Sequence, residues 1–573
     1  MQTLIELLER ATARYGERNA LGLRREDGTT FHWSYAELLR RSRLAAWRLR
    51  AAGLEPGDRV LTWSPSTPAL PAAYFGAMMA RLVYVPLDAR MSADAITNIV
   101  AASGATTLLL GSGRDAPDPG DVGLQSFPTI TLEHLSDEPA AGDGLPDDWE
   151  RQVAAWERPA TDELFQLVFT SGTTGSPKGV MLAHDNVLAG VGSFHLIIKP
   201  MEHRLVSLLP LSHSLEQAVS LFYALDVGAD ILYVRSRNPR VIFEALRDHR
   251  VTTMLLVPQL LDLFWSAIER EVERRGQAAN FMRLRRIARL LPYWARRRLF
   301  ASVHTQFGGG LRLFATAGAF LPPTLQQAWE DLGVIVLQGY GATETAAGSC
   351  TTMLDHPLGC VGWPPRPVEM RIADDGEIQF RGPTLFKGYW NNPEATAAAF
   401  TEDGWYQSGD LGTRDKKKRL RLHGRKKDII VLPNGFNVYP EDIENALRVA
   451  GIRDSVALES APGRIEVVVL APGSVAGAGS GERAATGGAT GGATGAGGAT
   501  RAAETPQASD NARAAIEAAI KTANRALGSQ QRIAGWRMWP DADFPRTHTF
   551  KVRRDRVRAW AAVEAALPVR DAD

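Results

Sequence analysis

Residues 164–179 read LFQLVFTSGTTGSPKG, in which a run of apolar side chains leads directly into a loop of small and hydroxylated residues. The run at 164–169 has the length and composition of a buried β-strand. The loop at 170–179 contains three glycines, five hydroxyl side chains and one lysine, Lys178. Glycine lets the backbone approach an anion closely, hydroxyl and backbone N–H groups donate hydrogen bonds to it, and lysine adds a positive charge. This stretch therefore predicts a strand followed by a phosphate-binding loop.

The loop differs from the common nucleotide-binding pattern, in which a second glycine lies five residues after the first and is followed at once by Lys and Ser or Thr. Pro177 occupies that position here. A surface turn rich in small polar residues is an alternative interpretation of this segment taken alone. Other segments of the sequence are needed to distinguish a phosphate-binding loop from a surface turn.

Short β-rich runs alternate with helix-length stretches through most of the 573 residues. The expected strands are residues 59–63, 82–86, 106–110, 164–170, 231–234, 252–257, 311–315 and 334–338, and the expected helices include 67–80, 216–225 and 239–249. This alternation predicts an α/β fold with mostly parallel sheets and crossover helices. A hydrophobic content of 45% is sufficient for the large core that such a fold requires.

The sequence changes character near residue 424. The residues beyond this point predict a small α+β unit, with strands near 455–458 and 465–470 and a helix near 512–526. We therefore expect an N-terminal domain at residues 1–424 and a C-terminal domain at residues 425–573. Residues 471–510 form a low-complexity tract of Ala, Gly, Thr and Ser, too poor in large apolar groups to offset the entropy of ordering, so we expect a disordered loop.

Charge and cysteine content narrow the class of protein. A net charge of +1 lacks the basic excess that a nucleic-acid partner requires. The two cysteines, Cys350 and Cys360, are too few for a disulfide framework and do not have metal-ligand spacing, which favours a reducing compartment. Charged residues interrupt residues 1–20, and no apolar run approaches the ~18 residues of a membrane span. We expect a cytoplasmic protein that does not bind nucleic acid.

Five further motifs accompany the phosphate-binding loop in a fixed order. They are PLSHSLEQ at 210–217, QGYGATET at 338–345, YQSGDLG at 406–412, HGRKKDIIVLPNGFNVY at 423–439 and PRTHTFKVR at 545–553. Together the six motifs resemble those of the adenylate-forming superfamily, which includes acyl-CoA synthetases, luciferases and the adenylation domains of peptide synthetases. The resemblance runs from Leu4 to Trp560, and the forms of PLSHSLEQ and GRKKDIIVLPNG are most similar to the long-chain fatty-acid branch.

The resemblance implies two half-reactions at one site. A carboxylate attacks the α-phosphorus of ATP and releases pyrophosphate, and the thiol of coenzyme A then cleaves the acyl adenylate. A carboxylate with a pKa of roughly 4 to 5 is already ionised at neutral pH, so the first step requires no general base. Catalysis then depends on positioning the reactants and on neutralising charge.

Site residues are assigned from the positions that match the motifs. Catalytic roles are implied for Lys178, Glu344 and Lys551. Mg²⁺ is implied between Glu344 and Thr170, whose oxygen atoms suit that ion. ATP contacts are implied for Thr170, Ser171, Gly172, Thr173, Thr174, Gly175, Lys178, Gly318, Ala319, Gly339, Tyr340, Gly341, Ala342, Thr343, Asp410, Arg425, Lys427, Gly435 and Lys551.

Within that set, Tyr340 resembles the aromatic residue that stacks on adenine, and Asp410 resembles the aspartate that binds both ribose hydroxyls. Taken alone, Tyr340 could be a core side chain, and Glu344 could be a solvated carboxylate at the start of a helix. Lys551 matches the lysine of the C-terminal domain that stabilises the adenylation step. The family often has Gly before this lysine, whereas this chain has Phe550.

The resemblance also implies that a mobile C-terminal domain rotates between the two half-reactions. Lys427 lies at the matching hinge position, and the loop around Gly435 is expected to approach the acyl carbonyl in the second step. The acyl pocket is expected to include His213, Gly318 and Gly341, although His213 could instead be a hydrogen-bonded structural residue. Each methylene contributes only about 1 kcal/mol to discrimination, so the expectation of a long chain depends on the resemblance.

Residues 274–298, from Arg274 to Arg298, contain nine arginines and no acidic side chain, interleaved with apolar and aromatic residues. One interpretation is contact with an anionic membrane surface, where each basic group contributes about 1 kcal/mol. The other is a helix whose apolar side packs on the large domain while its basic side faces water.

Two other classes of function are open from the sequence. The acyl group could be transferred to the phosphopantetheine arm of a carrier protein in place of coenzyme A. The chain could also be a non-catalytic binding protein on the same fold. The presence of Lys178, Glu344, Asp410, Arg425 and Lys551 together disfavours that second class.

Overall fold

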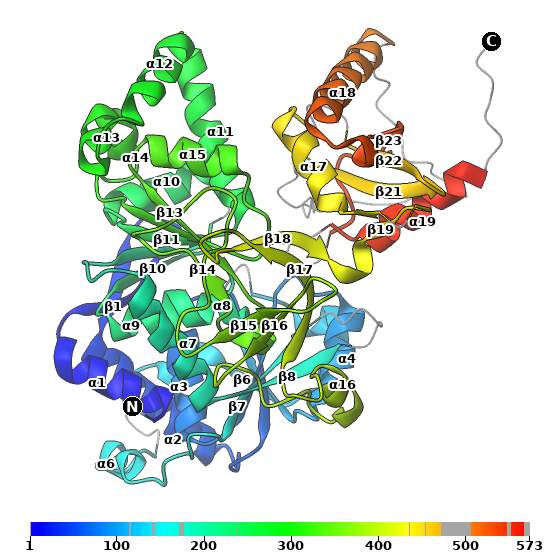
Figure 1. Ribbon diagram of the computed structural model, residues 1–573. Helices are drawn as coiled ribbons and strands as arrows, with labels where there is room; N and C mark the ends of the chain where they lie inside the picture. The colour runs from blue at the N-terminus through cyan, green and yellow to red at the C-terminus, as the bar shows by residue number, and fades with distance from the viewer. Residues whose placement is uncertain are drawn as a thin grey trace, which may run out of the picture. The chain divides into compact units, whose positions relative to one another are not determined.

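The structure is a computed structural model, and its contacts divide the chain into two units, Met1–Leu422 and His423–Asp573. The residues that it describes are 2–113, 116–139, 144–170, 177–236, 238–434, 436–452, 454–470, 506–546 and 552–566. The larger unit contains two mostly parallel sheets with helices packed against them, and the smaller unit is α+β (Figure 1). The predicted α/β class is therefore confirmed.

The first sheet of the larger unit contains the strand predicted from residues 164–170. Its order is β6-β5-β3-β4-β7-β8, with β3 (Arg59–Trp63), β4 (Val83–Leu87), β5 (Thr107–Leu110), β6 (Thr129–Thr131), β7 (Leu164–Thr170) and β8 (Lys178–Ala183). All neighbouring pairs are parallel except β7 and β8. Both faces are buried, because Val83 and Val85 pack in one apolar cluster and Tyr84 between them packs in another.

Helices cover the two faces of this sheet. Residues of α2 (Tyr35–Ala51) and α3 (Ala69–Met79) share a cluster with Val60 and Tyr84, whereas α4 (Ala93–Ser103) packs on the opposite face with Val83. Helix α3 is buried along its whole length, which explains its uniformly apolar sequence.

The second sheet has eight strands in the order β14-β13-β12-β11-β9-β10-β1-β2. They are β1 (Asn19–Arg24), β2 (Thr30–Ser34), β9 (Arg204–Ser207), β10 (Asp230–Val234), β11 (Thr253–Leu256), β12 (Leu313–Thr316), β13 (Ile335–Tyr340) and β14 (Ser349–Cys350). The six inner strands are parallel, and the edge strands β2 and β14 are antiparallel to their neighbours. One face packs on α10 (Pro239–Asp248), α11 (Pro258–Arg274) and α15 (Pro323–Asp331).

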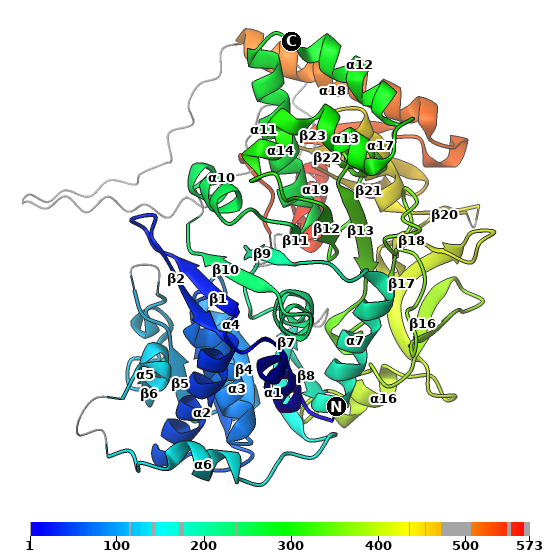
Figure 2. The same ribbon diagram turned by 90° about the vertical axis from the view of Figure 1, so that its left-hand side faces the viewer.

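Further helices of the larger unit are α1 (Leu4–Tyr15), α5 (Leu132–Ser136), α6 (Trp149–Ala154), α7 (His184–Ile197), α8 (Ser214–Glu216), α9 (Ala224–Asp226), α12 (Ala278–Ala288), α13 (Tyr293–Leu299), α14 (Ala301–Gln306) and α16 (Pro393–Ala398). In both views α12 lies at the far end of the larger unit from α6 (Figures 1 and 2). In the described ranges, no helix combines the length and apolar character that crossing a bilayer requires.

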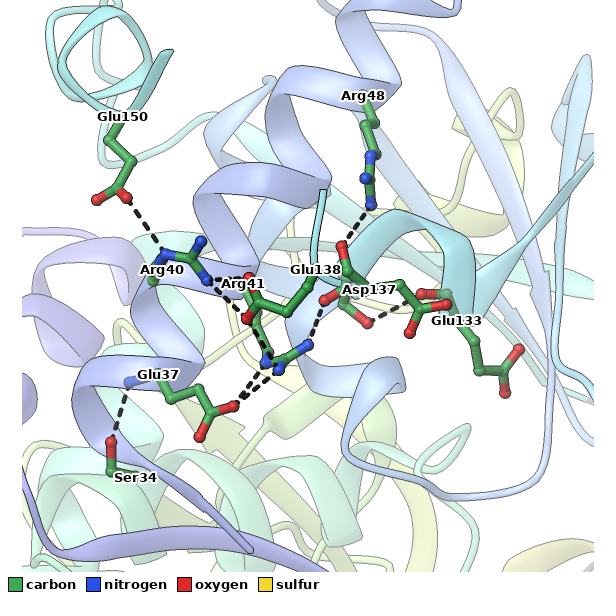
Figure 3. Close-up of polar contacts among 10 residues, drawn as sticks. Ser34, Glu37, Arg40, Arg41, Arg48, Glu133, Asp137, Glu138 and Glu150 are labelled. Carbon is green, nitrogen blue, oxygen red and sulfur yellow. Dashed lines mark hydrogen bonds and ion pairs between the residues drawn. The ribbon is translucent and has the colours of Figure 1, made fainter. Parts of the chain in front are cut away.

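Three arginines of α2 connect this helix to α5 and α6 (Figure 3). Arg41 donates to the backbone carbonyl of Ser136 at 2.6 Å. Arg40 lies 3.3 Å from Glu150 of α6. Arg48 donates to two backbone carbonyls within and just after α5. These contacts hold the short helices α5 and α6 against the longer helix that covers the sheet.

A third, antiparallel sheet lies in the larger unit except for the last residues of β18, which belong to the smaller unit, and it was not anticipated from the sequence. Its order is β15-β16-β17-β18, with β15 (Glu369–Ile372), β16 (Glu377–Arg381), β17 (Tyr406–Arg414) and β18 (Leu420–Arg425). The expected domain boundary near residue 424 falls within β18. Strand β17 contains the YQSGDLG motif, so this sheet positions Asp410.

The smaller unit has its own apolar clusters on both sides of a three-stranded sheet. The sheet is β21 (Ser455–Ala461), β22 (Arg464–Val469) and β23 (Gly535–Met538), packed with α17 (Pro440–Val449), α18 (Pro506–Ala526) and α19 (Arg554–Ala566). A separate pair, β19 (Ile430–Val431) and β20 (Asn437–Val438), precedes α17.

The low-complexity tract predicted at 471–510 falls mostly outside the described residues. Residues 506–510 are an exception, because they form the first turns of α18, so a loop over those five positions was wrong. Proline is well tolerated in the first turn of a helix, where its missing N–H costs nothing, and Pro506 is the first residue of α18.

Candidate active site

The predicted phosphate-binding loop connects the two antiparallel strands β7 and β8. Thr170 ends β7, Lys178 begins β8, and the two residues are paired across the hairpin. The hairpin therefore places the hydroxyl of a predicted metal ligand next to the predicted phosphate-binding cation. The predicted ATP contacts Ser171, Gly172, Thr173, Thr174 and Gly175 lie between them, outside the described residues.

Tyr389, which the sequence analysis missed, joins Lys178 to Glu344. The Lys178 ammonium lies 4.9 Å from the centroid of the Tyr389 ring. The Tyr389 hydroxyl donates to Glu344 Oε1 at 3.0 Å. Burial and the Glu344 charge raise the pKa of Tyr389 well above its usual range, so the hydroxyl stays protonated and acts as a donor. One tyrosine thus contacts two of the three predicted catalytic side chains.

Glu344 lies in a short 3-10 helix, Thr343–Thr345, that comes after β13. The Thr345 hydroxyl accepts a hydrogen bond from the Ala342 backbone N–H at 3.0 Å and fixes the start of this turn. Gly341 packs tightly here, since a Cβ on it would lie 3.1 Å from that hydroxyl oxygen. The QGYGATET motif therefore folds as a strand end followed by a tight turn that contains Glu344.

The donor set around Glu344 fits Mg²⁺ as a nucleotide-bound ion. The described residues contain no group of three or more His, Cys, Asp or Glu side chains that could hold a metal. Mg²⁺ usually takes only one or two protein carboxylates and completes its shell with substrate phosphates and water. One carboxylate from Glu344 and one hydroxyl from Thr170 match that requirement.

The predicted adenine and ribose residues contact each other directly. The Tyr340 hydroxyl, at the end of β13, donates to Asp410 Oδ2 on β17 at 2.7 Å. Gly318 lies just after β12 with a φ of +84°, and a Cβ on it would meet no heavy atom within 4 Å. Gly318 thus borders open space just beyond the end of the parallel strand β12, and Ala319 follows it in the chain. Such strand ends are where open α/β sheets usually bind ligands.

His213 is held by a carboxylate that sequence reasoning missed. Its Nε2 lies 3.0 Å from Asp88 Oδ2, and Asp88 also pairs with Arg90 at 2.8 Å. Burial alone would raise the pKa of Asp88, but hydrogen bonds from His213 and Arg90 and the Arg90 charge lower it well below its usual range. The sequence feature that could have identified this carboxylate is the charged pair Asp88 and Arg90, directly after the buried strand β4.

The PLSHSLEQ motif, which contains His213, also contacts the QGYGATET motif. The hydroxyls of Ser214 and Thr343 lie 3.4 Å apart and join PLSHSLEQ to QGYGATET. The predicted pocket residue and the predicted ATP residues therefore come together in the larger unit. Beyond them Glu216 is buried, and its Oε1 accepts a hydrogen bond from the Ser207 hydroxyl at 2.6 Å.

Gly339 lies in β13 of the larger unit, and the other predicted residues belong to the smaller unit. Arg425 ends β18, and Lys427 lies in a short 3-10 helix, Lys426–Asp428. Gly435 and Lys551 lie outside the described residues, so their expected roles are proposals.

Several known proteins are similar in sequence to this chain. The sequence profile of the family described as "AMP-binding enzyme" matches residues 8–390. A feruloyl-CoA synthase from Amycolatopsis is 30% identical over 450 residues, covering 74% of this chain and 79% of that protein. The long-chain-fatty-acid–CoA ligase FadD15 from Mycobacterium tuberculosis is 28% identical over 459 residues, covering 74% of each chain. A long-chain-fatty-acid–CoA ligase from Salmonella typhimurium is 27% identical over 505 residues, covering 80% of this chain and 83% of that protein.

Solved structures share the fold along nearly the whole chain. The anthranilate CoA ligase AuaEII in complex with anthranoyl-AMP has a TM-score of 0.73 at 17% identity, covering 99% of this chain and 98% of that one. ATP-bound MatB from Rhodopseudomonas palustris has a TM-score of 0.68 at 20% identity, covering 97% of this chain and 99% of that one. The profile match covers well over half of the sequence and includes Lys178, Tyr340, Glu344 and Tyr389. The chain therefore belongs to the AMP-binding enzyme family.

Proposed function

We propose that this AMP-binding enzyme activates a fatty acid with ATP, releases pyrophosphate, and transfers the acyl group from acyl-AMP to the thiol of coenzyme A. The observation that carries the proposal is the pair of opposite charges, Lys178 and Glu344, held at the end of the β7–β8 hairpin by one tyrosine. A cation and a metal-binding carboxylate at that position suit a triphosphate better than they suit a neutral ligand.

Each residue then has a task that its chemistry allows. Lys178 binds the β- and γ-phosphates, and Tyr340 supports adenine. Asp410 accepts hydrogen bonds from the ribose hydroxyls. Glu344 and Thr170 would hold Mg²⁺, whose charge would neutralise phosphate oxygens. Because the carboxylic acid is already ionised, the chain has only to orient it toward the α-phosphorus and stabilise the developing charge, the task we assign to Lys551.

We also propose that the fatty-acid substrate has a long acyl chain. The support for a long chain is that two of the similar proteins are long-chain-fatty-acid–CoA ligases. A feruloyl-CoA synthase is similar to the same degree, so an aromatic acid has to be tested as well. Burial of each methylene contributes about 0.8 kcal/mol, so a long chain could add on the order of 10 kcal/mol to binding. Transfer to a carrier protein is the second candidate for the acceptor step.

The decisive experiment is ATP–pyrophosphate exchange with a panel of acids from acetate to palmitate, with ferulate included. We expect exchange that requires Mg²⁺ and increases with chain length, and then formation of acyl-CoA when coenzyme A is added. Absence of exchange with every carboxylic acid would exclude the proposed function. Exchange without acyl-CoA, but with acylation of a phosphopantetheinylated carrier protein, would favour the second acceptor.

We also propose peripheral contact with an anionic membrane through residues 274–298. One side of α12 packs inward, with Phe281 and Leu284 against the core of the larger unit. The other side exposes Met282 and Ile287 beside Arg283 and Arg286, with no acidic residue in the segment. A surface that combines these exposed apolar side chains with the positive charges of Arg283 and Arg286 suits the headgroup region of an anionic bilayer, into which fatty acids also partition.

A further inference from the structure

We propose that Tyr389 is a positioning residue that holds the Lys178 ammonium and the Glu344 carboxylate apart and in register for a magnesium-bound triphosphate. The inference rests on the proposed function, because it assigns phosphate binding to Lys178 and metal binding to Glu344. It adds a residue that no motif in the sequence identified.

The Tyr389 side chain makes two different contacts. Its ring face receives the Lys178 ammonium at 4.9 Å from the centroid, which is a cation–π interaction. Its hydroxyl donates to Glu344 Oε1 at 3.0 Å, and Tyr406 also hydrogen-bonds to it. Ring and hydroxyl can therefore be removed separately by substitution, since phenylalanine keeps the first contact and loses the second.

The backbone fixes the position of this tyrosine. Residues 386–390 run along the edge strand β8, where the Met181 N–H donates to the Gly388 carbonyl at 3.0 Å and the Trp390 N–H donates to the Gly179 carbonyl at 2.8 Å. At the other end of the segment, the Phe386 N–H donates to the backbone carbonyl of Glu344 at 2.8 Å. One short segment thus connects the phosphate-binding hairpin with the turn that holds the carboxylate.

Packing restricts the ring further. Tyr389 is only 8% exposed, and its ring lies 4.8 Å from that of Phe386 in an edge arrangement. Its backbone N–H donates to the Thr396 hydroxyl at 2.9 Å. A side chain that is buried and held at both ends keeps its orientation before any ligand arrives.

Charge explains why a tyrosine suits this position. Lysine and glutamate at the same site would otherwise tend to form a direct ion pair, which ATP and Mg²⁺ would have to break. Among the residues that the structure describes, Lys178 and Glu344 form no ion pair with each other, and each has a neutral partner in Tyr389. Neither charge is neutralised, so both remain able to bind an oppositely charged group.

The test is equilibrium binding of ATP, measured by displacement of a fluorescent ATP analogue, with excess Mg²⁺ and with EDTA. For Tyr389→Phe we expect a threefold to tenfold loss of affinity in Mg²⁺ and little change in EDTA, because the hydroxyl's hydrogen bonds to Glu344 and Tyr406 are lost whereas the ring contact with Lys178 is kept. For Tyr389→Leu we expect a loss of about tenfold under both conditions, because Lys178 also loses its partner. The Mg²⁺ concentration for half-maximal exchange should rise in Tyr389→Phe.

Tyr293→Phe is the matched control, because it also removes a tyrosine hydroxyl that hydrogen-bonds to a glutamate, Glu330, away from this site. We expect wild-type affinities for that variant. Wild-type affinities in Tyr389→Phe under both conditions would overturn the inference, as would an equal loss with and without Mg²⁺. Failure of the proposed function looks different, because the wild-type protein itself would then support no exchange with any acid.

Discussion

Two buried carboxylates near the predicted acyl pocket have pKa values shifted in opposite directions, because only one of them has charged partners. Asp88 is paired with Arg90 and with His213, and its pKa is lowered despite burial. Glu216 has hydroxyl partners, Ser207 and Ser220, and burial raises its pKa to about 7. The same functional group is therefore an anion at one position and largely a neutral acid at the other below neutral pH.

Replacement of Glu216 by glutamine should remove a pH dependence of stability. The native pKa of about 7 exceeds the ordinary 4.5, so the native state holds the proton more tightly and Glu216 favours folding most below about pH 4.5. That contribution declines as pH rises from about 4.5 to 7. Glu216→Gln keeps an acceptor for the Ser207 hydroxyl but has no group that titrates in this range. The free energy of unfolding of the variant relative to wild type should therefore increase from pH 5 to pH 8, by at most roughly 3 kcal/mol.

Thermal unfolding at several pH values measures this difference. Glu157→Gln serves as the control, because that side chain is 82% exposed on the surface. Parallel melting curves for wild type and Glu216→Gln over pH 5 to 8 would contradict the assignment.

The arginines in and next to helix α12 lie in two different environments. Arg285 is buried against Asp331 of α15, and Arg289 bonds to the same carboxylate at 3.0 Å. Arg283 and Arg286 lie on the opposite, exposed side of the helix. The packed-helix interpretation therefore holds for one side of α12, and the membrane contact is proposed for the exposed side only.

Charge reversal on the exposed side tests the proposed membrane contact. We expect Arg283→Glu/Arg286→Glu to reduce co-sedimentation with phosphatidylglycerol vesicles at least tenfold, because each basic group near an anionic surface contributes about 1 kcal/mol. Wild-type binding should decrease in 0.5 M salt and with phosphatidylcholine vesicles.

A double variant with the same change in net charge provides the control. Lys199→Glu/Arg240→Glu alters two exposed cations outside residues 274–298 and should bind the vesicles as well as wild type, apart from a weak long-range effect. If the wild-type protein does not bind anionic vesicles at low salt, the membrane proposal fails.

The residues to which we assign catalytic and binding roles belong to both units of the chain. Lys178, Glu344 and Asp410 belong to the larger unit, whereas Arg425 and Lys427 belong to the smaller one. Lys551, which we assign to adenylation, lies in the same smaller part of the sequence. A chain organised in this way can use different residues of the smaller unit for the two half-reactions.

Two variants should separate those half-reactions. Lys551→Ala should lose most acyl-adenylate formation and retain much of the thiolysis of supplied acyl-AMP. Lys427→Pro should spare adenylation and impair thiolysis, because proline restricts the backbone at the proposed hinge. Rapid-quench measurement of both steps distinguishes the two. Equal loss of both steps in Lys551→Ala, or an adenylation defect in Lys427→Pro, would contradict these roles.

Local patterns in the chain were sufficient for much of the fold. Strands β3 and β7 coincide with the expected runs at 59–63 and 164–170, and the remaining expected strands overlap observed ones to within two or three residues at their ends. Apolar runs, turn residues and strand–helix alternation are properties of neighbouring residues, so they can be read without knowing the tertiary contacts. The candidate site residues Lys178, Tyr340, Glu344 and Asp410 were assigned from the resemblance of the motifs to a known family, which also requires only the sequence.

Contacts between distant segments could not be obtained in that way. Tyr340 and Asp410 are 70 residues apart and Tyr389 and Glu344 are 45 apart, yet both pairs are joined by hydrogen bonds. Asp88 beside His213, the antiparallel sheet of β15 to β18, and the inward or outward direction of each arginine in α12 are further examples. Which residues meet depends on strand order, register and helix packing, and these are set by the simultaneous burial of apolar surface throughout the chain.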